Sequence, residues 1–346
     1  MSKNLIASRL TEISLNKNIP LIGTLELTYR CPLKCVHCYL PQTKGRLPIL
    51  RKKELSTEDW KRVLRQLKKV GCLYIVFTGG EPLLREDLVK LCQYAAKLNF
   101  SVQIFSTGYN ITKELVEKLK SCSIASFEMS FYGRKRIHNK ITGDKTSFDM
   151  TLEAAKLVAA SGIAVKSKVP LMRENFGEMA YIRDMCKKYG FTYTFDPILA
   201  PANDGNKQAL KYRITKNQIK ALLKDPNLDF LSDCSQEGRN KQEDFFCGAG
   251  KNVFGINPYG EVYPCCQFPK VIGNIHGKSF SDIWKKSYWL KKWRKLSIQD
   301  LKECPACKYL SFCNRCPGLS LVGDGSMMGP SRIACDIAKI RYSLLK

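Results

Sequence analysis

The sequence has no apolar run that approaches the roughly 20 residues of a membrane-spanning helix. Its opening segment, residues 1–20, contains neither the continuous apolar core nor the cleavage pattern of a secretory signal peptide. Internal repeats and low-complexity tracts are also missing. These absences argue against the membrane, secreted and repeat classes, and they predict a soluble protein of the cytoplasm.

Acidic residues are in short supply. The chain has 31 Asp and Glu residues against 57 Lys and Arg residues, which gives a formal net charge of +26. Such an excess favours acidic partners: nucleic acid, an acidic peptide or an acidic electron donor. The basic residues are spread along the whole chain, however, and form no basic arm and no RNA-binding signature. A lysine-rich solvated surface explains most of this charge, and nucleic acid is not the expected partner.

Cysteine, by contrast, is abundant, with 16 residues. In a reducing compartment, clustered cysteines mark metal or redox sites more often than disulfides. Four cysteines are scattered among apolar residues and are interpreted as small buried hydrophobes, namely Cys72, Cys92, Cys122 and Cys186. The other cysteines fall within residues 31–38 and 234–335. These two groups are the candidate metal sites.

Strand and helix patterns alternate from residue 24 to about residue 200, and 44% of the chain is hydrophobic. Strict alternation favours parallel strands joined by helices. Six such units are too few for a closed eight-stranded barrel. We therefore expect an α/β fold, a partial (β/α)6 TIM-like barrel. The six strands are predicted over residues 24–30, 73–80, 101–108, 124–133, 163–172 and 191–201.

The texture of the sequence changes after residue 201, and loops, turns and cysteines dominate from Cys234 onward. A region with so little apolar periodicity needs staples to fold. We expect a short N-terminal extension over residues 1–23, the barrel over 24–232, and a small cysteine-rich domain over 233–346.

Chemistry-bearing residues follow the predicted strands. Active sites of α/β barrels form at the carboxyl ends of the strands, so these loops should converge. The first strand is followed by Cys31, Cys35 and Cys38, the second by residues 79–82 (GGEP), the third by Thr107 and the fourth by Ser130.

Three thiolates can hold three irons of a [4Fe–4S] cluster and leave the fourth iron open. Structural zinc needs four closed ligands instead, and His37 lies too close to Cys38 to complete a tetrahedron without strain. Glycines allow close approach of the backbone to a ligand, and Glu81 can accept hydrogen bonds from an ammonium group. The pattern indicates a site for a ligand that carries an amino acid.

A C-x3-C-x2-C loop after the first strand, with GGEP after the second, resembles the radical S-adenosylmethionine superfamily. The resemblance implies that the three cysteines bind a [4Fe–4S] cluster and that cleavage of S-adenosylmethionine yields a 5′-deoxyadenosyl radical. It also implies a cofactor-binding role for several residues. His37 takes the usual aromatic position, and Thr107 and Ser130 are ribose or carboxylate contacts. The GGEP contacts are Gly79, Gly80, Glu81 and Pro82.

The C-terminal cysteines form a second array. Residues 256–265 predict a hairpin that turns at Tyr259 and Gly260. Taken alone, the C-x2-C-x5-C-x2-C run over residues 304–316 would suit a four-thiolate zinc site. The candidate ligands are Cys247, Cys265, Cys304, Cys307, Cys313, Cys316 and Cys335, with Cys266 beside them.

This second array resembles the SPASM domain that follows the barrel in many radical S-adenosylmethionine enzymes, which implies one or two auxiliary iron–sulfur clusters. By the family pattern, the outer cluster takes Cys304, Cys307, Cys313 and Cys335, and the inner cluster takes Cys247, Cys265 and Cys316. The sequence departs from the family where two residues, instead of three, separate Cys313 from Cys316. The fourth inner ligand is left open between Cys234, Cys266 and none, and Cys234 is also a candidate hydrogen-atom donor.

Enzymes similar to this one mostly modify peptides, which implies a ribosomally made precursor peptide as substrate and a thioether or carbon–carbon crosslink as product. Epimerisation, or action on a haem precursor or on RNA, is the alternative within the family. Cys266 stands where sulfatase-maturing relatives carry aspartate, which disfavours that activity. A non-catalytic, basic zinc and nucleic-acid-binding protein is the alternative outside the family.

The same resemblance implies partners. About two dozen residues precede the first predicted strand, so we expect no N-terminal leader-binding domain and infer a separate leader-binding protein. Flavodoxin or ferredoxin is the expected electron donor.

Overall fold

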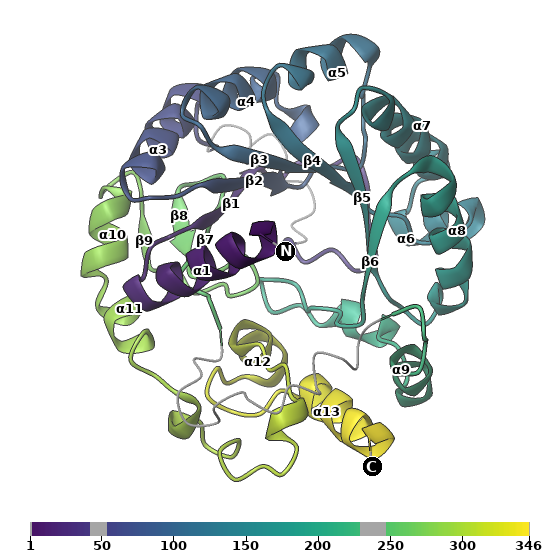
Figure 1. Ribbon diagram of the computed structural model, residues 1–346, viewed down its shortest axis with the longest axis vertical. Coiled ribbons are helices and arrows are strands. Elements are labelled where there is room, and N and C mark those ends of the chain that lie inside the picture. Colours follow the sequence, from purple (N-terminus) through teal and green to yellow (C-terminus); the bar gives the residue numbers. More distant parts are fainter. Residues whose placement is uncertain (1, 42–53, 229–246, 346) are drawn as a thin grey trace.

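The computed structural model describes residues 2–41, 54–228 and 247–345, and its centre is one curved, nine-stranded sheet (Figure 1). The strand order is β6-β5-β4-β3-β2-β1-β7-β8-β9. Strands β1 to β6 pair in parallel throughout, which confirms the predicted partial α/β barrel. Their bounds are β1 Ile22–Thr28, β2 Tyr74–Gly79, β3 Ser101–Phe105, β4 Ile124–Met129, β5 Ala164–Pro170 and β6 Thr192–Asp196.

Helices cover the convex face of the sheet, as Figure 1 shows for α3, α4, α5, α7 and α8. Within the described ranges, no helix combines the length and the apolarity needed to cross a bilayer. The barrel helices are α3 Thr57–Lys69, α4 Leu88–Lys97, α5 Lys113–Lys120, α6 Lys135–Thr142, α7 Ser147–Ala160 and α8 Met179–Tyr189. The remaining α-helices are α1 Ser2–Lys17, α9 Lys216–Leu223, α10 Phe280–Lys286, α11 Tyr288–Trp293, α12 Pro317–Asp324 and α13 Arg332–Leu345. Short 3-10 turns include η1 Pro82–Leu84 and η3 Gln208–Tyr212.

Helix α3 illustrates how the sequence sets these helices. Ser56 caps its first turn, and the Ser56 and Asp59 side chains form a reciprocal capping box. Its buried side chains recur three and four residues apart, so they make one apolar stripe against the sheet. The stripe consists of Trp60, Val63, Leu64 and Leu67.

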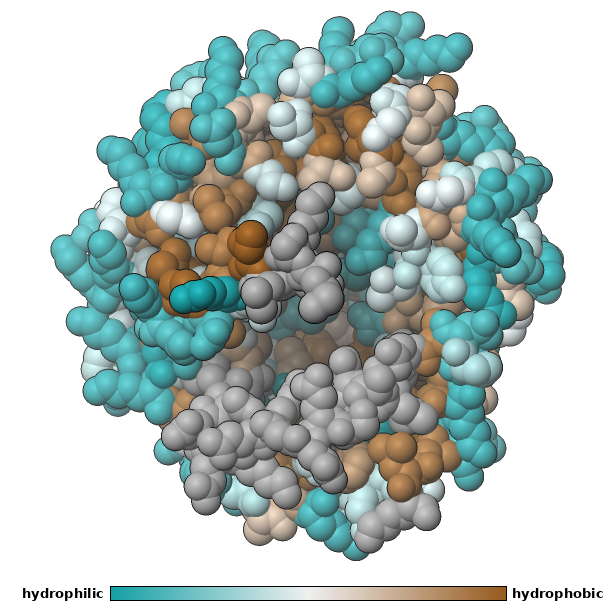
Figure 2. Space-filling view, viewed as in Figure 1, coloured by the Kyte–Doolittle hydropathy of each residue, from teal (hydrophilic) through white to brown (hydrophobic). Residues whose placement is uncertain are grey.

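The strands divide the molecule into an apolar and a polar side. Leu25 and Leu27 of β1 belong to the main hydrophobic core beneath the helices. The alternate residues Thr24, Glu26 and Thr28 therefore face the concave side, because successive side chains of a strand point to opposite faces. We call this concave side the lumen. Figure 2 shows a central hollow with hydrophilic side chains inside it.

The predicted C-terminal hairpin is present, with strands β7 Val253–Ile256 and β8 Glu261–Tyr263 pairing antiparallel around Gly260. Strand β9 Gly273–Asn274 extends it. The sequence did not predict that β7 would pair in parallel with β1, so that the hairpin prolongs the barrel sheet. The domain limits at residues 24–232 and 233–346 stay a prediction.

Gly23 is a point of close contact between β1 and β7. It pairs with Phe254, and an added methyl group would stand 2.4 Å from the Cζ atom of that ring. Phe254 is buried and packs against Phe280 at 4.6 Å between ring centroids, so it has no room to withdraw. We expect Gly23→Ala to cost about 1–3 kcal/mol, the usual range for overpacking.

The measurement is the melting temperature of the anaerobically purified protein. Gly277→Ala is the matched control, because an added methyl there meets no atom within 4 Å. Equal melting temperatures for the two variants would contradict the close contact between β1 and β7.

Candidate functional site

The three predicted cluster ligands lie on one loop that leaves the carboxyl end of β1. Backbone hydrogen bonds anchor this loop to the end of α6. The Lys34 amide donates to the Thr142 carbonyl at 2.9 Å, and the Val36 amide donates to the Ile141 carbonyl at 3.0 Å. The structure thus holds Cys31, Cys35 and Cys38 together on a fixed backbone.

All three thiols are partly buried. Burial raises the pKa of Cys31 to about 12 and raises the pKa of Cys35 further, and each thiol also feels the negative charge of Cys38. Such thiols stay protonated until a metal takes the place of the proton. In the described part of the chain, no three His, Cys, Asp or Glu side chains surround a single point that one metal ion would fill. Ligands of a four-iron cluster need not do so, because each thiolate binds a different iron, so the loop fits such a cluster.

The GGEP segment is bound directly to the start of this loop. The Gly80 amide donates to the Thr28 carbonyl and the Glu81 amide to the Arg30 carbonyl, both at 2.8 Å. Gly79 has a φ of +123°, and an added methyl on either glycine would stand 2.2 Å from one of those carbonyl oxygens. Only glycine permits this approach. Pro82 then opens the turn η1.

Glu81 is fully buried, and its carboxylate is held by the protein itself. It accepts hydrogen bonds from the Ser106 hydroxyl at 2.9 Å, the Leu83 amide at 3.0 Å, and both the amide and the hydroxyl of Thr107 at 2.6 Å. Burial raises the pKa of Glu81, and these hydrogen bonds oppose the rise. Glu81 and Thr107 therefore join the ends of β2 and β3; contact of either residue with S-adenosylmethionine stays a prediction.

His37 and Ser130 meet at Tyr132, which the sequence analysis did not single out. The His37 Nε2 atom and the Tyr132 hydroxyl are 3.1 Å apart, and Tyr132 also hydrogen bonds Ser130. Burial lowers the pKa of His37 to about 4, so the ring is neutral. Its Nδ1 atom has no hydrogen-bond partner among the described residues. The ring thus offers one free nitrogen beside the cluster loop.

Glu26 is a further residue that the sequence analysis missed. Its carboxylate is 2% exposed and accepts hydrogen bonds from the Tyr39 hydroxyl at 2.6 Å and the Tyr29 hydroxyl at 3.0 Å. Burial raises its pKa to about 7, and the two tyrosines oppose that rise. The available signal was a lone acidic residue within an apolar strand, which is costly unless it is paired or functional.

Charged groups from β4 and β5 line another part of the lumen. Lys166 lies 3.7 Å from Glu128. Lys168 lies over the Phe105 ring, 5.2 Å from its centroid, and its charge reaches Asp196 and Cys266. The lumen is thus suited to a polar substrate.

The C-terminal cysteines fall into two sets. Arg315 lies within electrostatic range of members of both sets. Its guanidinium donates to the Gly329 and Met327 carbonyls. In the outer set, each of Cys304, Cys313 and Cys335 lies within electrostatic range of Cys307. In the inner set, Cys247 lies within range of Cys316 and Cys265.

Cys266 lies between the inner set and the lumen. Its thiol hydrogen bonds Cys265 and Thr24, and it lies within electrostatic range of Glu26, Tyr39 and Lys168. Cys234, the other candidate for the fourth ligand, lies outside the described residues.

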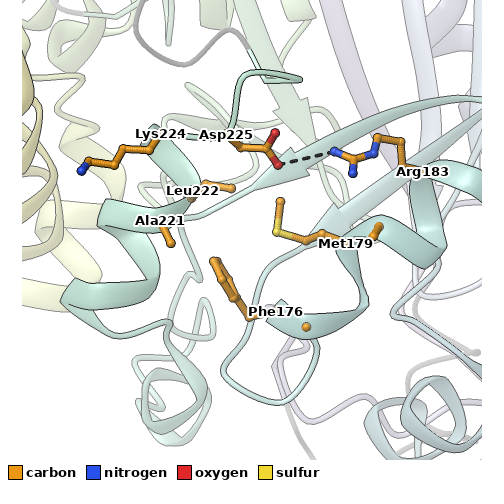
Figure 3. A pocket seen from close by; sticks show the side chains of 9 residues that line it. Phe176, Met179, Arg183, Ala221, Leu222, Lys224 and Asp225 are labelled. Atoms are coloured by element: carbon orange, nitrogen blue, oxygen red, sulfur yellow. Dashed lines mark hydrogen bonds and ion pairs between the residues drawn. The ribbon is translucent and has the colours of Figure 1, made fainter.

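A separate hollow of about 380 Å³ lies between α8 and α9 (Figure 3). It has an apolar lining that includes Phe176, Met179 and Leu222, and the Arg183–Asp225 ion pair spans 3.5 Å beside it. It holds none of the predicted site residues, so it is not part of the candidate site.

Because the charged and polar neighbours of Cys266 belong to the lumen, we expect that it is not an iron ligand. Cys266→Ala should keep the iron content of the wild type, whereas Cys247→Ala should lose one cluster, about four irons. Iron per chain after anaerobic reconstitution is the measurement. A loss of about four irons in Cys266→Ala would make it the fourth inner ligand.

Glu81→Gln should weaken binding of S-adenosylmethionine. One oxygen of Glu81 would become an NH2 group that faces existing donors, which costs about 1–3 kcal/mol and loosens the GGEP segment. We expect an affinity at least about fivefold lower by calorimetry, since 1.4 kcal/mol is about tenfold. Glu117→Gln on the exposed face of α5 is the control, and Thr107→Val, which removes one donor, should give a smaller effect. Wild-type affinity in Glu81→Gln would contradict this role.

The chain is similar to known proteins in sequence and in fold. The PqqA peptide cyclase of Bradyrhizobium diazoefficiens is 25% identical over 357 residues, covering 95% of this chain and 89% of the cyclase. Streptococcus suis SuiB, in its complex with S-adenosylmethionine, superposes with a TM-score of 0.66 at 19% identity, covering 96% of this chain and 82% of SuiB. The protein anSMEcpe with bound AdoMet superposes with a TM-score of 0.70 at 18% identity, covering 94% and 96% of the two chains.

Family models cover the two halves of the site. Residues 25–186, which carry the cluster loop and GGEP, match the radical SAM superfamily. Residues 247–317, which carry most of the C-terminal cysteines, match the iron–sulfur cluster-binding SPASM domain. The chain therefore carries a radical S-adenosylmethionine superfamily domain over residues 25–186, followed by a SPASM domain over residues 247–317.

Proposed function

We propose that this enzyme matures a ribosomally made peptide by forming a thioether or carbon–carbon crosslink in it. The PqqA peptide cyclase is a relative over 95% of this chain. A similar fold is seen in SuiB bound to its precursor peptide SuiA, with a TM-score of 0.65 at 18% identity. The first protein is named as a peptide cyclase, and the second was crystallised with a precursor peptide. We carry that substrate class over to this chain.

The cofactors supply the radical chemistry. When bound, the [4Fe–4S] cluster and S-adenosylmethionine together provide a 5′-deoxyadenosyl radical that takes a hydrogen atom from the peptide. The residues of the chain hold and orient them. We assign the cluster to Cys31, Cys35 and Cys38. The methionine moiety is assigned to residues 79–82 and the remainder of S-adenosylmethionine to His37, Thr107 and Ser130.

The observation that carries the proposal is the junction of the inner cysteine set with the lumen. Cys265 of that set touches Cys266, whose other neighbours include Thr24 and Glu26 on the lumen wall. A peptide side chain in the lumen would lie beside an auxiliary cluster. Crosslinking removes two hydrogen atoms from a peptide, and the 5′-deoxyadenosyl radical accounts for one of them. The surplus electron that remains needs such an acceptor.

Epimerisation is the second candidate, favoured by the Cys266 thiol itself. A thiol at the lumen can return a hydrogen atom to a peptide radical from the opposite face, which would invert the residue without forming a crosslink. The thiyl radical that this leaves would take one electron, supplied through the electron donor, and one proton to restore the thiol. The product would then keep the mass of the substrate.

Two further partners complete the proposal: a flavodoxin or ferredoxin that supplies electrons, and a separate leader-binding protein.

The test is incubation of the reconstituted enzyme with a peptide encoded beside its gene. We expect a product that lacks two hydrogen atoms by mass spectrometry, together with 5′-deoxyadenosine. Alanine at Cys31, Cys35 or Cys38 should abolish both. Alanine at Cys304 should spare cleavage of S-adenosylmethionine and lose the crosslink.

Each contrary result has a distinct meaning. An unchanged mass with an inverted residue would replace crosslinking with epimerisation. 5′-Deoxyadenosine formation in the Cys31→Ala variant would overturn the radical assignment. Full crosslinking in the Cys304→Ala variant would remove the outer cluster from the reaction.

A further inference from the structure

A hollow of about 190 Å³ opens beside the cluster loop, on the side of the loop that follows β6. Cys35 and Cys38 line it from one side, and Ala202, Gln208 and Ala209 line it from the other. Two ligands of the proposed S-adenosylmethionine-binding cluster therefore border a surface hollow. This hollow is a short route from solvent to that cluster.

The segments that border the hollow are packed against one another. A small hydrophobic cluster, separate from the main core, joins the cluster loop, α6, the end of β5 and η3. Its buried members pack across segments that are distant in sequence, so the segments are held in one arrangement. The cluster consists of Tyr132, Ile141, Met172, Leu199 and Ala209, with Val36, Ile137 and Tyr212 packed against it.

Basic residues alternate with the members of this hydrophobic cluster along the sequence. We call them the basic rim: Lys34, Arg136, Lys140, Lys207 and Lys211, all exposed. Within the described ranges, none of the five forms an ion pair. Arg134 and Lys135, the neighbours of Arg136, are instead paired with Glu178 and Asp149. In the segments that carry the rim, residues 34–40, 135–144 and 204–213, the acids are the exposed Asp204 and the half-buried Asp144, so these segments have a positive excess.

We propose that the basic rim is the docking surface for an acidic one-electron donor protein. This inference rests on the proposed function, which requires one electron for each cleavage of S-adenosylmethionine. The reduced flavin or iron–sulfur centre of the donor is oxidised by one electron, and the cluster held by Cys31, Cys35 and Cys38 receives it. No atom is transferred.

Charge complementarity selects the donor. Lys34 lines the hollow, and the other rim residues lie on segments that line it or pack beside it. Uncompensated basic residues attract an acidic protein and orient it before contact, which raises association rates about 10- to 1,000-fold at low salt. The hollow also brings the redox centre of a docked donor toward the ligands of the cluster. The general positive charge of the chain would attract a donor to any part of the surface. The basic rim would place that donor beside Cys35 and Cys38.

The test compares two triple charge reversals. The rim variant is Lys140→Glu, Lys207→Glu and Lys211→Glu, which leaves Lys34 intact between the cluster ligands. The control variant is Lys113→Glu, Lys118→Glu and Lys120→Glu on α5, which changes the net charge equally at another exposed surface (Figure 1). The first readout is the dissociation constant of a purified flavodoxin for each protein, by surface plasmon resonance at low and at physiological salt.

We expect the rim variant to bind flavodoxin at least about tenfold more weakly at low salt, with the difference shrinking at higher salt because of screening. The control variant should stay close to the wild type. The second readout is 5′-deoxyadenosine formation: with flavodoxin it should fall in the rim variant, and with dithionite it should not change.

Equal flavodoxin affinity in the rim and control variants would overturn the proposal. So would an equal loss with dithionite, because the rim would then support the cluster itself. Weaker binding of an acidic precursor peptide, with unchanged flavodoxin binding, would reassign the rim to the substrate. If the wild type makes no 5′-deoxyadenosine with dithionite, the proposed function fails, while the binding comparison still reports on the rim.

Discussion

The site depends on one backbone contact, in which GGEP lies directly against the end of β1. The Gly80 and Glu81 amides bind the Thr28 and Arg30 carbonyls at 2.8 Å, an approach that leaves no space for a side chain. The loop with the three cysteines begins one residue after Arg30. A shift of GGEP would therefore move the cluster ligands and the predicted S-adenosylmethionine contacts together. One contact sets both halves of the cofactor site in register.

Buried Glu81 extends this contact to the third strand. Four donors from η1 and from the loop after β3 converge on its carboxylate, so the ends of β1, β2 and β3 become one hydrogen-bonded unit. An unpaired buried carboxylate would cost several kcal/mol, and this arrangement offsets that cost only while all donors are in place. Such a unit is stiff. Stiffness suits a site that must hold a reactive radical against one hydrogen atom of a substrate.

The sequence predicted the six parallel strands because each is an apolar or alternating run bounded by turn residues. It overran their ends where residues leave the ladder for the site. Residues 101–108 were predicted as a strand, but β3 ends at Phe105 because Ser106 and Thr107 turn to bind Glu81. The pairing of the four-residue β7 with β1 could not be predicted from local sequence. It joins residues that are far apart in the chain, such as Gly23 and Phe254. Glu26 was missed because its hydrogen-bond partners, Tyr29 and Tyr39, come close to its carboxylate only in the folded chain.

The charge of Arg315 bears on how two sets of thiolates can lie close together. Each set gains negative charge when it binds metal, and neighbouring negative sites in a partly buried region repel each other. The Arg315 guanidinium lies within range of Cys304, Cys313 and Cys335 of the outer set and of Cys316 of the inner set. Burial lowers its pKa, and the cysteine charges oppose that fall. Arg315, held by the Gly329 and Met327 carbonyls, is therefore a fixed cation within electrostatic range of both sets, and it would lessen the repulsion that their charge creates.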